Sequence, residues 1–248
     1  MPVLHVVIPF LDEESTLGGI VDRLATCGWP EGWRSRIVLV DDGSGPDDAE
    51  TARRLAEERD AIDLVRHPRN LGKGAALRTG FALVLEDAGE DDLVAVQDAD
   101  LEYSPEELVL LVEAMIASRA DAAFGNRWGE HAAGRVRRVH RLGNQFLTWL
   151  SNRLTGLSLS DMECCFKMMR VPVLRTVLPD LDEDRFGIEP QMTASLARHD
   201  ARIVEIDVSY EPRSFAEGKK IGPRDAVAAV STMLREWRRT RRVRSRNS

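Results

Sequence analysis

The feature that most limits the fold of this chain is the repeated alternation of short apolar runs with amphipathic segments between residues 4 and 124. The apolar runs have the length of strands, and the segments between them carry apolar residues at helical spacing. Strands are predicted at 4–8, 36–40, 62–65, 93–97 and 122–124, and helices at 15–25, 47–59, 74–86 and 105–118. This alternation predicts an α/β fold with a mainly parallel, Rossmann-like sheet that helices cover on both faces.

The helix predicted at 105–118 begins with a recognisable signal. Pro105 stands in its first turn, where a missing backbone N–H group costs nothing. Ser104 and Glu107 have the spacing of a capping box, in which each side chain accepts a hydrogen bond from the other residue's backbone N–H group. We therefore expect these two side chains to close the first turn of the helix.

The rest of the chain predicts an amphipathic C-terminal elaboration of this fold. A basic stretch at 135–141 precedes a helical face formed by Leu142, Phe146, Trp149 and Leu150. A late strand is predicted at 202–210. A last helix at 225–239 carries one apolar side, formed by Val227, Val230, Leu234 and Trp237. Because there is no repeat and no low-complexity linker, we expect one domain at 1–240, followed by a basic tail at 241–248.

Charge is distributed unevenly along the chain. The formal net charge is −7, yet residues 235–246 contain seven arginines and one glutamate. A uniformly basic chain would indicate a nucleic-acid partner, but the remainder is acidic, so no nucleic acid is expected. A local basic segment beside amphipathic helices instead indicates a peripheral contact with an anionic membrane surface.

Cysteine usage and hydropathy bear on the compartment. Cys27, Cys164 and Cys165 offer neither a disulfide framework nor a C-x-x-C metal spacing. Asp12 comes too early for a signal peptide, and no run of about 18 apolar residues is available for a transmembrane helix. We therefore expect a cytoplasmic protein, with any membrane contact at the inner surface.

Polar residues follow each of the first four predicted strands. Parallel strands bring their carboxyl ends to one edge of a sheet, where ligands of open α/β sheets bind. The residues that the chain places there are Pro9, Asp12 and Glu14 after the first strand, Asp41 and Asp42 after the second, Lys73 after the third, and Asp98, Ala99 and Asp100 after the fourth. This edge is therefore the predicted site.

The most informative of these segments is the Asp98-Ala99-Asp100 loop. Two carboxylates that are two residues apart at the end of a buried strand can turn toward one hard cation. Mg²⁺ and Mn²⁺ prefer such oxygen ligands and often share them with substrate phosphates. A turn that caps the following helix is the alternative explanation of this loop. The position after a buried strand favours a metal site that stabilises a departing diphosphate.

The glycine-rich segment at 70–74 superficially resembles a phosphate-binding loop. Gly74 follows Lys73 where the P-loop pattern requires Ser or Thr, so a P-loop nucleotidase is excluded. The segment still offers backbone N–H groups and one lysine to a nucleotide, or it serves only as a tight turn into a helix.

Several segments in fixed order resemble family 2 glycosyltransferases with the A-type fold. These are VVIPFLDEEST, IVLVDDGS, NLGKGAALRTG, QDADLEYSPEEL and GNRW. The later segments, LGNQFLTWLSNRLTGLSLSDMECCFKMMR and RFGIEPQMTASLARHDARIVEIDVSYEPRSFAEGKKI, are similar to the dolichyl-phosphate and polyprenyl-phosphate sugar synthases. The resemblance runs from about Val3 to Trp237, nearly the whole chain. The chain departs from the family pattern at Asp12, where Asn is usual, and at Gln191, where a second Glu is usual.

The resemblance implies roles for individual residues. The nucleotide-sugar would be bound by Pro9, Asp12, Glu14, Asp41, Asp42, Lys73, Asp98, Ala99 and Asp100, and the metal by Asp98 and Asp100, with Glu102 nearby. Phosphates and the acceptor would be bound by Arg127, Glu189, Arg213 and Lys219. Asp161, Arg127 and Arg213 would be catalytic, with Asp161 beside the acceptor. Residues 1–130 would form the nucleotide-sugar-binding half and residues 131–240 the acceptor-binding half.

The implied activity is a metal-dependent, inverting transfer of a sugar from a UDP- or GDP-linked donor to a polyprenyl phosphate, with Mg²⁺ or Mn²⁺ as cofactor. An ionised phosphate acceptor needs positioning more than a base, whereas a hydroxyl acceptor needs general-base help, for which Asp161 is the candidate. A soluble hydroxyl-bearing acceptor, such as a glycan or natural product, is the alternative. A second alternative is a non-catalytic module that only binds a nucleotide-sugar. The intact pair Asp98 and Asp100 argues against this alternative.

Overall fold

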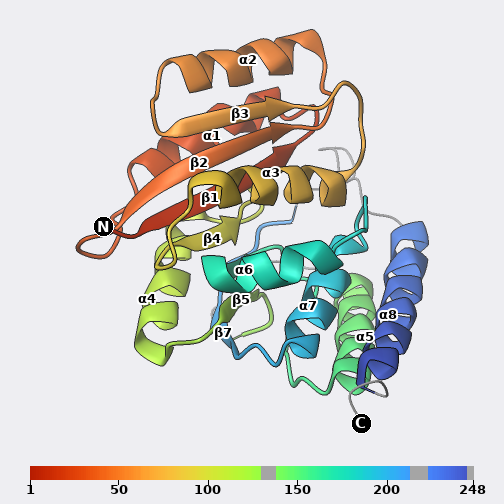
Figure 1. The fold of residues 1–248 in the computed structure, drawn as a ribbon. Helices are drawn as coiled ribbons and strands as arrows, with labels where there is room; N and C mark the ends of the chain where they lie inside the picture. The colour runs from red at the N-terminus through yellow and green to blue at the C-terminus, as the bar shows by residue number, and fades with distance from the viewer. Residues whose placement is uncertain (130–137, 213–222, 245–248) are drawn as a thin grey trace.

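The computed structural model describes residues 1–129, 138–212 and 223–244 (Figure 1). It contains a seven-stranded sheet in the order β3-β2-β1-β4-β6-β5-β7. The strands are β1 (Val3–Phe10), β2 (Arg34–Asp41), β3 (Ile62–Arg66), β4 (Leu93–Val96), β5 (Ala122–Asn126), β6 (Lys167–Arg170) and β7 (Ile203–Asp207). The helices are α1 (Glu14–Ala25), α2 (Pro46–Glu57), α3 (Lys73–Asp87), α4 (Leu108–Ser118), α5 (Arg138–Thr155), α6 (Val171–Val177), α7 (Ile188–Arg198) and α8 (Pro223–Arg244), with 3₁₀ turns η1 (Pro105–Glu107) and η2 (Leu178–Asp180).

Most strand pairs in this sheet are parallel, as predicted. β1 lies between β2 and β4 with both pairs parallel, and β3 extends this group beyond β2. β6 is antiparallel to both of its neighbours, β4 and β5, whereas β5 and β7 are again parallel. The predicted strands are all present, but β6 was not predicted. β6 lies between β4 and β5, so it connects the group formed by the first four strands with the pair formed by β5 and β7.

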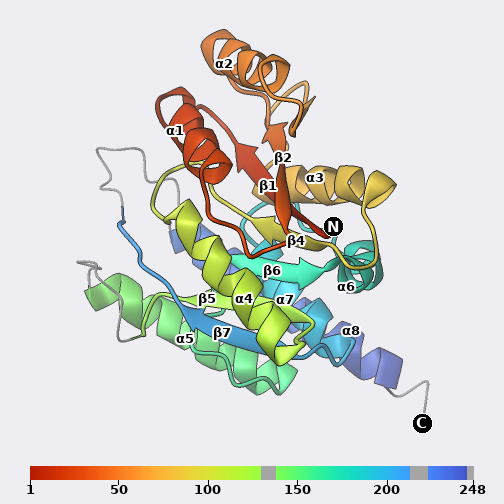
Figure 2. The ribbon, with the colours of Figure 1, turned by 90° about the vertical axis from the view of Figure 1, so that its left-hand side faces the viewer.

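Two hydrophobic cores lie on opposite faces of the sheet, because successive strand side chains point to opposite sides. In β1, Val6 and Ile8 belong to the core beneath α1, α2 and α4, and Val7 belongs to the other. The second core is covered by α3, α5, α6, α7 and α8. Figure 2 shows α1 and α3 on opposite sides of β1. The predicted α/β class with helices on both faces is confirmed.

The predicted capping box at Ser104 and Glu107 is wrong. The segment begins with η1, and neither side chain caps it. The Ser104 hydroxyl donates to Glu106 and accepts from Arg23 of α1, at 2.9 and 2.7 Å. The Glu107 carboxylate accepts hydrogen bonds from the backbone N–H and the hydroxyl of Ser209. Tertiary partners therefore take both side chains away from the helix end.

Helices α5, α7 and α8 lie side by side (Figure 1). On α5, Leu142, Phe146 and Trp149 are 65%, 55% and 60% exposed, whereas Leu150 packs partly against the second core. On α8, Val227 and Leu234 are exposed but Val230 packs partly inward. The predicted apolar faces are therefore divided between core and surface.

Helix α8 ends at Arg244, so the predicted tail at 241–248 begins inside this helix rather than after it. Over the described residues, no helix has the length and apolar character needed to cross a bilayer.

Candidate functional site

The loops after β1 and β2 meet at the predicted edge of the sheet. Phe10 of β1 pairs with Asp41 of β2, which places the following residues next to one another. The Ser44 hydroxyl accepts a hydrogen bond from the Asp12 backbone at 3.0 Å, and the Asp12 carboxylate accepts one from the Gly45 backbone at 3.2 Å. Asp12 adopts a positive φ of 54° in this link.

Two further residues of the first loop differ in burial. Pro9 is buried within β1, whereas Glu14 is exposed in the first turn of α1. The positive end of a helix favours a carboxylate at this position. Glu14 thus faces solvent at the sheet edge, while Pro9 contributes to the strand.

The two aspartates at the end of β2 are bound within the protein. The Asp42 carboxylate accepts hydrogen bonds from the backbone N–H groups of Leu71 and Gly72 at 2.9 and 2.8 Å, and it lies 2.7 Å from His67 Nδ1. Asp41 accepts one from the Ser44 backbone at 2.7 Å, and Arg66 pairs with it at 2.9 Å. Both carboxylates are buried and shape the loops that surround the site.

The loop before α3 approaches a second segment so closely that it needs glycine. Gly72 has a φ of +107°, and a Cβ atom there would lie 2.3 Å from the carbonyl oxygen of Asp184. Such a φ is readily adopted only by glycine. Asp42 on one side and the Asp184 segment on the other therefore fix the loop that carries Lys73 into α3.

Lys73 joins the two halves of the chain. Its Nζ lies 2.8 Å from Asp98 Oδ1 and 2.9 Å from Glu189 Oε1, and it donates to Cys165 Sγ at 3.3 Å. Burial favours a lower pKa for Lys73, but the negative charges of Asp98 and Glu189 hold this pKa well above its usual value. Conversely, Lys73 lowers the pKa of Asp98 against the effect of burial. The lysine is therefore charged, and it neutralises the first aspartate of the loop after β4.

The loop after β4 presents two carboxylates. The Asp98 side chain is 15% exposed, Ala99 is buried, and the Asp100 carboxylate accepts a hydrogen bond from the Glu102 backbone at 3.1 Å. Leu101 has a positive φ of 59°, which turns the chain sharply at this point. Tyr210 donates a hydrogen bond to the Glu102 carboxylate at 2.7 Å.

Asp98 and Asp100 fit a divalent ion that is shared with a substrate. Within the described ranges, no group of three or more His, Cys, Asp or Glu side chains is arranged as a complete metal site. Mg²⁺ commonly uses only one or two carboxylates together with substrate phosphates, so two aspartates on one tight loop are a sufficient protein contribution.

Arg127 and Asp161 form a buried, two-pronged ion pair. The guanidinium donates from its Nε and an Nη atom to the two Asp161 oxygens, both at 2.7 Å. Asp161 has no exposed surface, and the backbone of Arg127 donates to it as well, at 3.1 Å. The guanidinium also lies 5.2 Å from the Tyr210 ring centre and 5.3 Å from that of Trp128. Asp161 therefore orients Arg127 and presents no oxygen to solvent in this arrangement.

Two predicted phosphate-binding residues, Arg213 and Lys219, lie outside the described residues. The fourth, Glu189, is 4% exposed at the start of α7 and reaches Lys73. The structure thus brings Lys73, Asp98 and Glu189 together from three elements. Sequence reasoning missed Cys165, which contacts Lys73, and Glu163, whose pKa burial raises to about 7. An acidic residue two positions after Asp161 was the available signal for Glu163.

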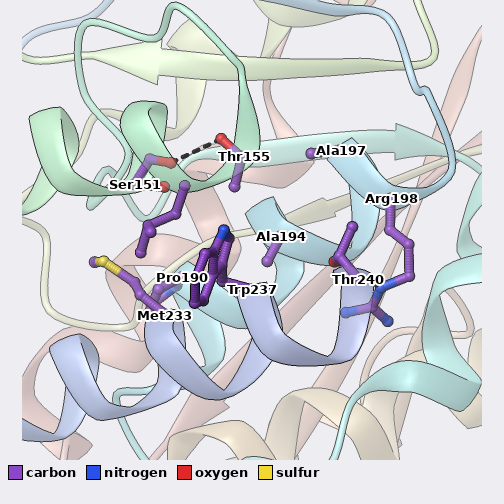
Figure 3. A pocket seen from close by; sticks show the side chains of 10 residues that line it. Ser151, Thr155, Pro190, Ala194, Ala197, Arg198, Met233, Trp237 and Thr240 are labelled. Atoms are coloured by element: carbon purple, nitrogen blue, oxygen red, sulfur yellow. Dashed lines mark hydrogen bonds between the residues drawn. The ribbon is translucent and has the colours of Figure 1, made fainter. Parts of the chain in front are cut away.

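A groove between α5, α7 and α8 contains none of the predicted site residues (Figure 3). It is lined by Ser151, Leu154, Thr155, Pro190, Ala194, Ala197, Arg198, Met233, Trp237 and Thr240. Arg198 is occupied there, because it pairs with Asp180 at 2.8 Å and with Glu236. This groove belongs to the packing of the helical layer.

Solved structures share the fold of this chain. A complex of glucosyl-3-phosphoglycerate synthase from Mycobacterium tuberculosis with Mn²⁺, UDP-glucose and phosphoglyceric acid matches with a TM-score of 0.68 and 18% identity, over 95% of this chain and 80% of that one. TarS 1–349 of S. aureus with UDP-GlcNAc matches with a TM-score of 0.63 and 17% identity, over 95% and 66%. These likenesses concern the fold, and they confirm the predicted A-type glycosyltransferase architecture.

A curated relative is more similar in sequence. The undecaprenyl-phosphate 4-deoxy-4-formamido-L-arabinose transferase of Edwardsiella ictaluri (strain 93-146) is 32% identical over 223 residues, which cover 87% of this chain. The present chain spans 62% of the length of that relative. The family model described as glycosyl transferase family 2 matches residues 5–178, well over half of the chain. The chain therefore belongs to glycosyl transferase family 2.

Proposed function

We propose that this glycosyltransferase moves a sugar from a UDP- or GDP-linked donor to a polyprenyl phosphate, with inversion at the anomeric carbon. The observation that carries the proposal is the meeting of Lys73, Asp98 and Glu189, because it joins the loop of a metal-and-diphosphate site to the second half of the chain. The curated relative supports the acceptor class, since its name describes an undecaprenyl-phosphate sugar transferase.

The donor would be bound at the carboxyl ends of the first four strands, within residues 1–130. Asp12 and Glu14 lie at the rim of this region, and Asp41 and Asp42 support its loops. Asp98 and Asp100 would hold Mg²⁺ or Mn²⁺, which neutralises charge on the departing diphosphate. Lys73 would add a second positive charge beside the first aspartate, where the diphosphate oxygens are expected.

The acceptor phosphate would be bound within residues 131–240 together with Arg127. We assign Arg127, Arg213 and Lys219 to the phosphate groups, and Glu189 to the region between donor and acceptor. The bidentate pair with Asp161 holds the Arg127 guanidinium in one orientation, which is what recognition of a phosphate needs. Asp161 then acts as a positioning residue. A phosphate oxygen that is already ionised at neutral pH attacks without a general base.

A peripheral membrane contact would bring the enzyme to a lipid-linked acceptor. The exposed residues Leu142, Phe146 and Trp149 form one stripe on α5, and the rings of Phe146 and Trp149 stack with centroids 6.0 Å apart. Arg141 and Arg153 are exposed on the same helix. Apolar side chains flanked by arginines suit the boundary between lipid head groups and acyl chains.

The test is transfer with defined partners. The purified chain is incubated with Mn²⁺ and, in turn, UDP-glucose, UDP-galactose, UDP-N-acetylglucosamine or GDP-mannose, with and without undecaprenyl phosphate, and the products are identified by mass. A glycosylated lipid phosphate is expected, and EDTA should prevent its formation. Transfer only to a hydroxyl-bearing acceptor, or full transfer in EDTA, would contradict the acceptor or the metal part of the proposal respectively.

A further inference from the structure

Among the described residues, Glu189 and Glu163 each keep one buried side-chain oxygen without a hydrogen bond. Glu189 uses Oε1 for Lys73, but its Oε2 has no partner in the part of the chain that the structure describes. Oε1 of Glu163 is also buried and, among the same described residues, has no partner. A buried acceptor left unbonded destabilises the folded protein. Groups that break the rule of satisfied buried polar atoms in this way are typical of functional sites.

Glu163 is flanked by contacts to both proposed substrate sites. Two residues before it, Asp161 binds Arg127 on the acceptor side. Two residues after it, Cys165 contacts Lys73, which binds Asp98 on the donor side. The transferred sugar must lie between these sides, because its anomeric carbon is bonded to the departing diphosphate and is attacked by the acceptor oxygen. Glu163 therefore lies on the chain between a contact to the acceptor side and a contact to the donor side, and the charges of both Arg127 and Glu189 act on it.

The electrostatic surroundings of Glu163 are mixed. Burial raises the pKa of Glu163 to about 7, and the negative charges of Glu189 on α7 and Asp161 act in the same direction. The positive charges of Lys167 on β6 and Arg127 after β5 act in the opposite direction and lower this pKa. The Nζ of Lys167 is itself held by the backbone carbonyl of Met162 at 2.8 Å. In either protonation state a carboxyl group with a free oxygen accepts a hydrogen bond from a hydroxyl group.

We propose that Glu163 is a specificity residue that accepts a hydrogen bond from a hydroxyl group of the transferred sugar, with the free oxygen of Glu189 as a second acceptor beside it. The donor sugar is then a neutral one that directs hydroxyl groups toward the start of α7. This inference rests on the proposed function, because it uses the donor and acceptor sides defined there.

The experiment compares the wild-type chain with Glu163→Gln, Glu163→Leu and a control, Asp48→Asn. Asp48 on α2 is a matched residue, since it is also partly buried and also has one buried oxygen without a partner among the described residues. Figure 1 shows α2 at the top of the view, far from α7 in the lower half. For each protein, kcat/KM is measured with Mn²⁺ and the best donor of the panel named above. The affinity for that donor is then compared with the affinity for its bare nucleoside diphosphate.

Glu163→Leu is expected to lose about 10-fold or more in kcat/KM, because it removes the acceptor of a hydrogen bond from the sugar. Glu163→Gln keeps one acceptor oxygen and should lose less than Glu163→Leu. The affinity of both variants for the bare nucleoside diphosphate should stay unchanged, so the loss lies in the sugar contribution. The melting temperature of Glu163→Leu should be equal or higher, because an unsatisfied buried carboxyl group has been removed. Asp48→Asn should keep wild-type kinetics.

Three outcomes would overturn the inference. They are wild-type kcat/KM in Glu163→Leu, an equal loss in Asp48→Asn, and a parallel loss of melting temperature and nucleoside-diphosphate affinity in Glu163→Gln, which would mark a structural role. If the wild-type protein turns over a donor and any of these three outcomes is found, the Glu163 assignment is refuted and the proposed function stands. No turnover by the wild type with any donor refutes the proposed function and this inference with it.

Discussion

Replacing Asp161 by Asn tests how the structure holds Arg127. The substitution keeps the shape of the side chain but leaves the Arg127 guanidinium, whose side chain is 7% exposed, without its counter-charge. Removing one partner of a buried ion pair costs about 3–5 kcal/mol. For a domain of this size, 1 kcal/mol corresponds to about 2–4 °C in the melting temperature, so a decrease of about 6–20 °C is expected.

Urea and thermal unfolding measure this effect, and two further variants sharpen it. Asp63→Asn removes a carboxylate that also binds an arginine, Arg36, at 2.8 Å, but this pair is 35% and 41% exposed. It should cost at most about 1 kcal/mol. The double variant Asp161→Asn, Arg127→Met should be more stable than Asp161→Asn alone, because no buried charge is left unpaired.

The same variant separates positioning from base catalysis. If Asp161 only orients Arg127, Asp161→Asn lowers the transfer rate without removing an ionisation from the pH profile. A stability change below about 1 kcal/mol, or a double variant that loses the sum of the two single effects, would refute the buried-pair argument. The disappearance of a basic ionisation in the mutant, with folding intact, would refute the positioning role and restore Asp161 as a general base.

Four other predictions follow from contacts described above. Asp98→Asn and Asp100→Asn should each lose most transfer activity, since a bound metal contributes several kcal/mol; activity that Mn²⁺ does not influence would contradict this. Phe146→Ser with Trp149→Ser should weaken binding to phosphatidylglycerol vesicles in sedimentation assays while donor hydrolysis stays unchanged, and equal binding would exclude this stripe as the lipid contact. Glu236→Ala should destabilise the fold by about 1.5–3 kcal/mol in urea, because it removes one of the two carboxylates that pair with the buried Arg198 side chain while Asp180 remains. The hydrogen bond from Arg23 lowers the pKa of Glu106 to about 2. The pair therefore stabilises the fold at pH values above the pKa of Glu106 in the unfolded chain, and this stabilisation is lost as the pH falls toward 2. Because the side chains of Arg23 and Glu106 are 39% and 49% exposed, Glu106→Gln should lower the free energy of unfolding by at most about 1 kcal/mol at pH 7 and should have no effect near pH 2.

The parallel part of the fold was predictable because its strands are long apolar runs bounded by polar loops. β6 was missed for the opposite reason: it has four residues, begins with Lys167 and ends with Arg170, and shows no alternation. Lys167 is fully buried only because backbone carbonyls of Met162 and Cys164 accept from its Nζ. Such a partner set depends on tertiary structure and leaves no local pattern.

Helix α7 was missed because burial on every side erases the amphipathic signal. Gln191, Thr193 and Ser195 are fully buried, and their polar groups are bonded within the helical layer, for example Ser195 to Asp180 at 2.7 Å. A sequence reader expects such residues at the surface. The start of this helix, Glu189, was singled out by family resemblance and not by periodicity.

In the site, the order of loops along the sheet edge predicted which segments meet. It did not predict which side chains keep oxygens that are free to bind a ligand. Asp42 is predicted to bind the nucleotide-sugar because it follows a strand, and Asp161 is predicted to be catalytic because it lies in a family motif. The structure shows their oxygens bound to backbone N–H groups and to an arginine. Glu163, which no motif argument emphasised, keeps one buried oxygen without a partner among the described residues, as Glu189 does.

The position of β6 has a consequence for how the protein is made. β5 belongs to the first half of the chain, yet its two neighbours in the sheet, β6 and β7, both belong to the second. A ribosome that has released only residues 1–130 has therefore produced a strand with no partner, and the sheet closes only after β6 has emerged and inserted beside β4. Pairing over such sequence separations slows folding. Donor and acceptor halves can be named separately, but an expression plasmid that divides the gene between them would separate β5 from every strand it pairs with.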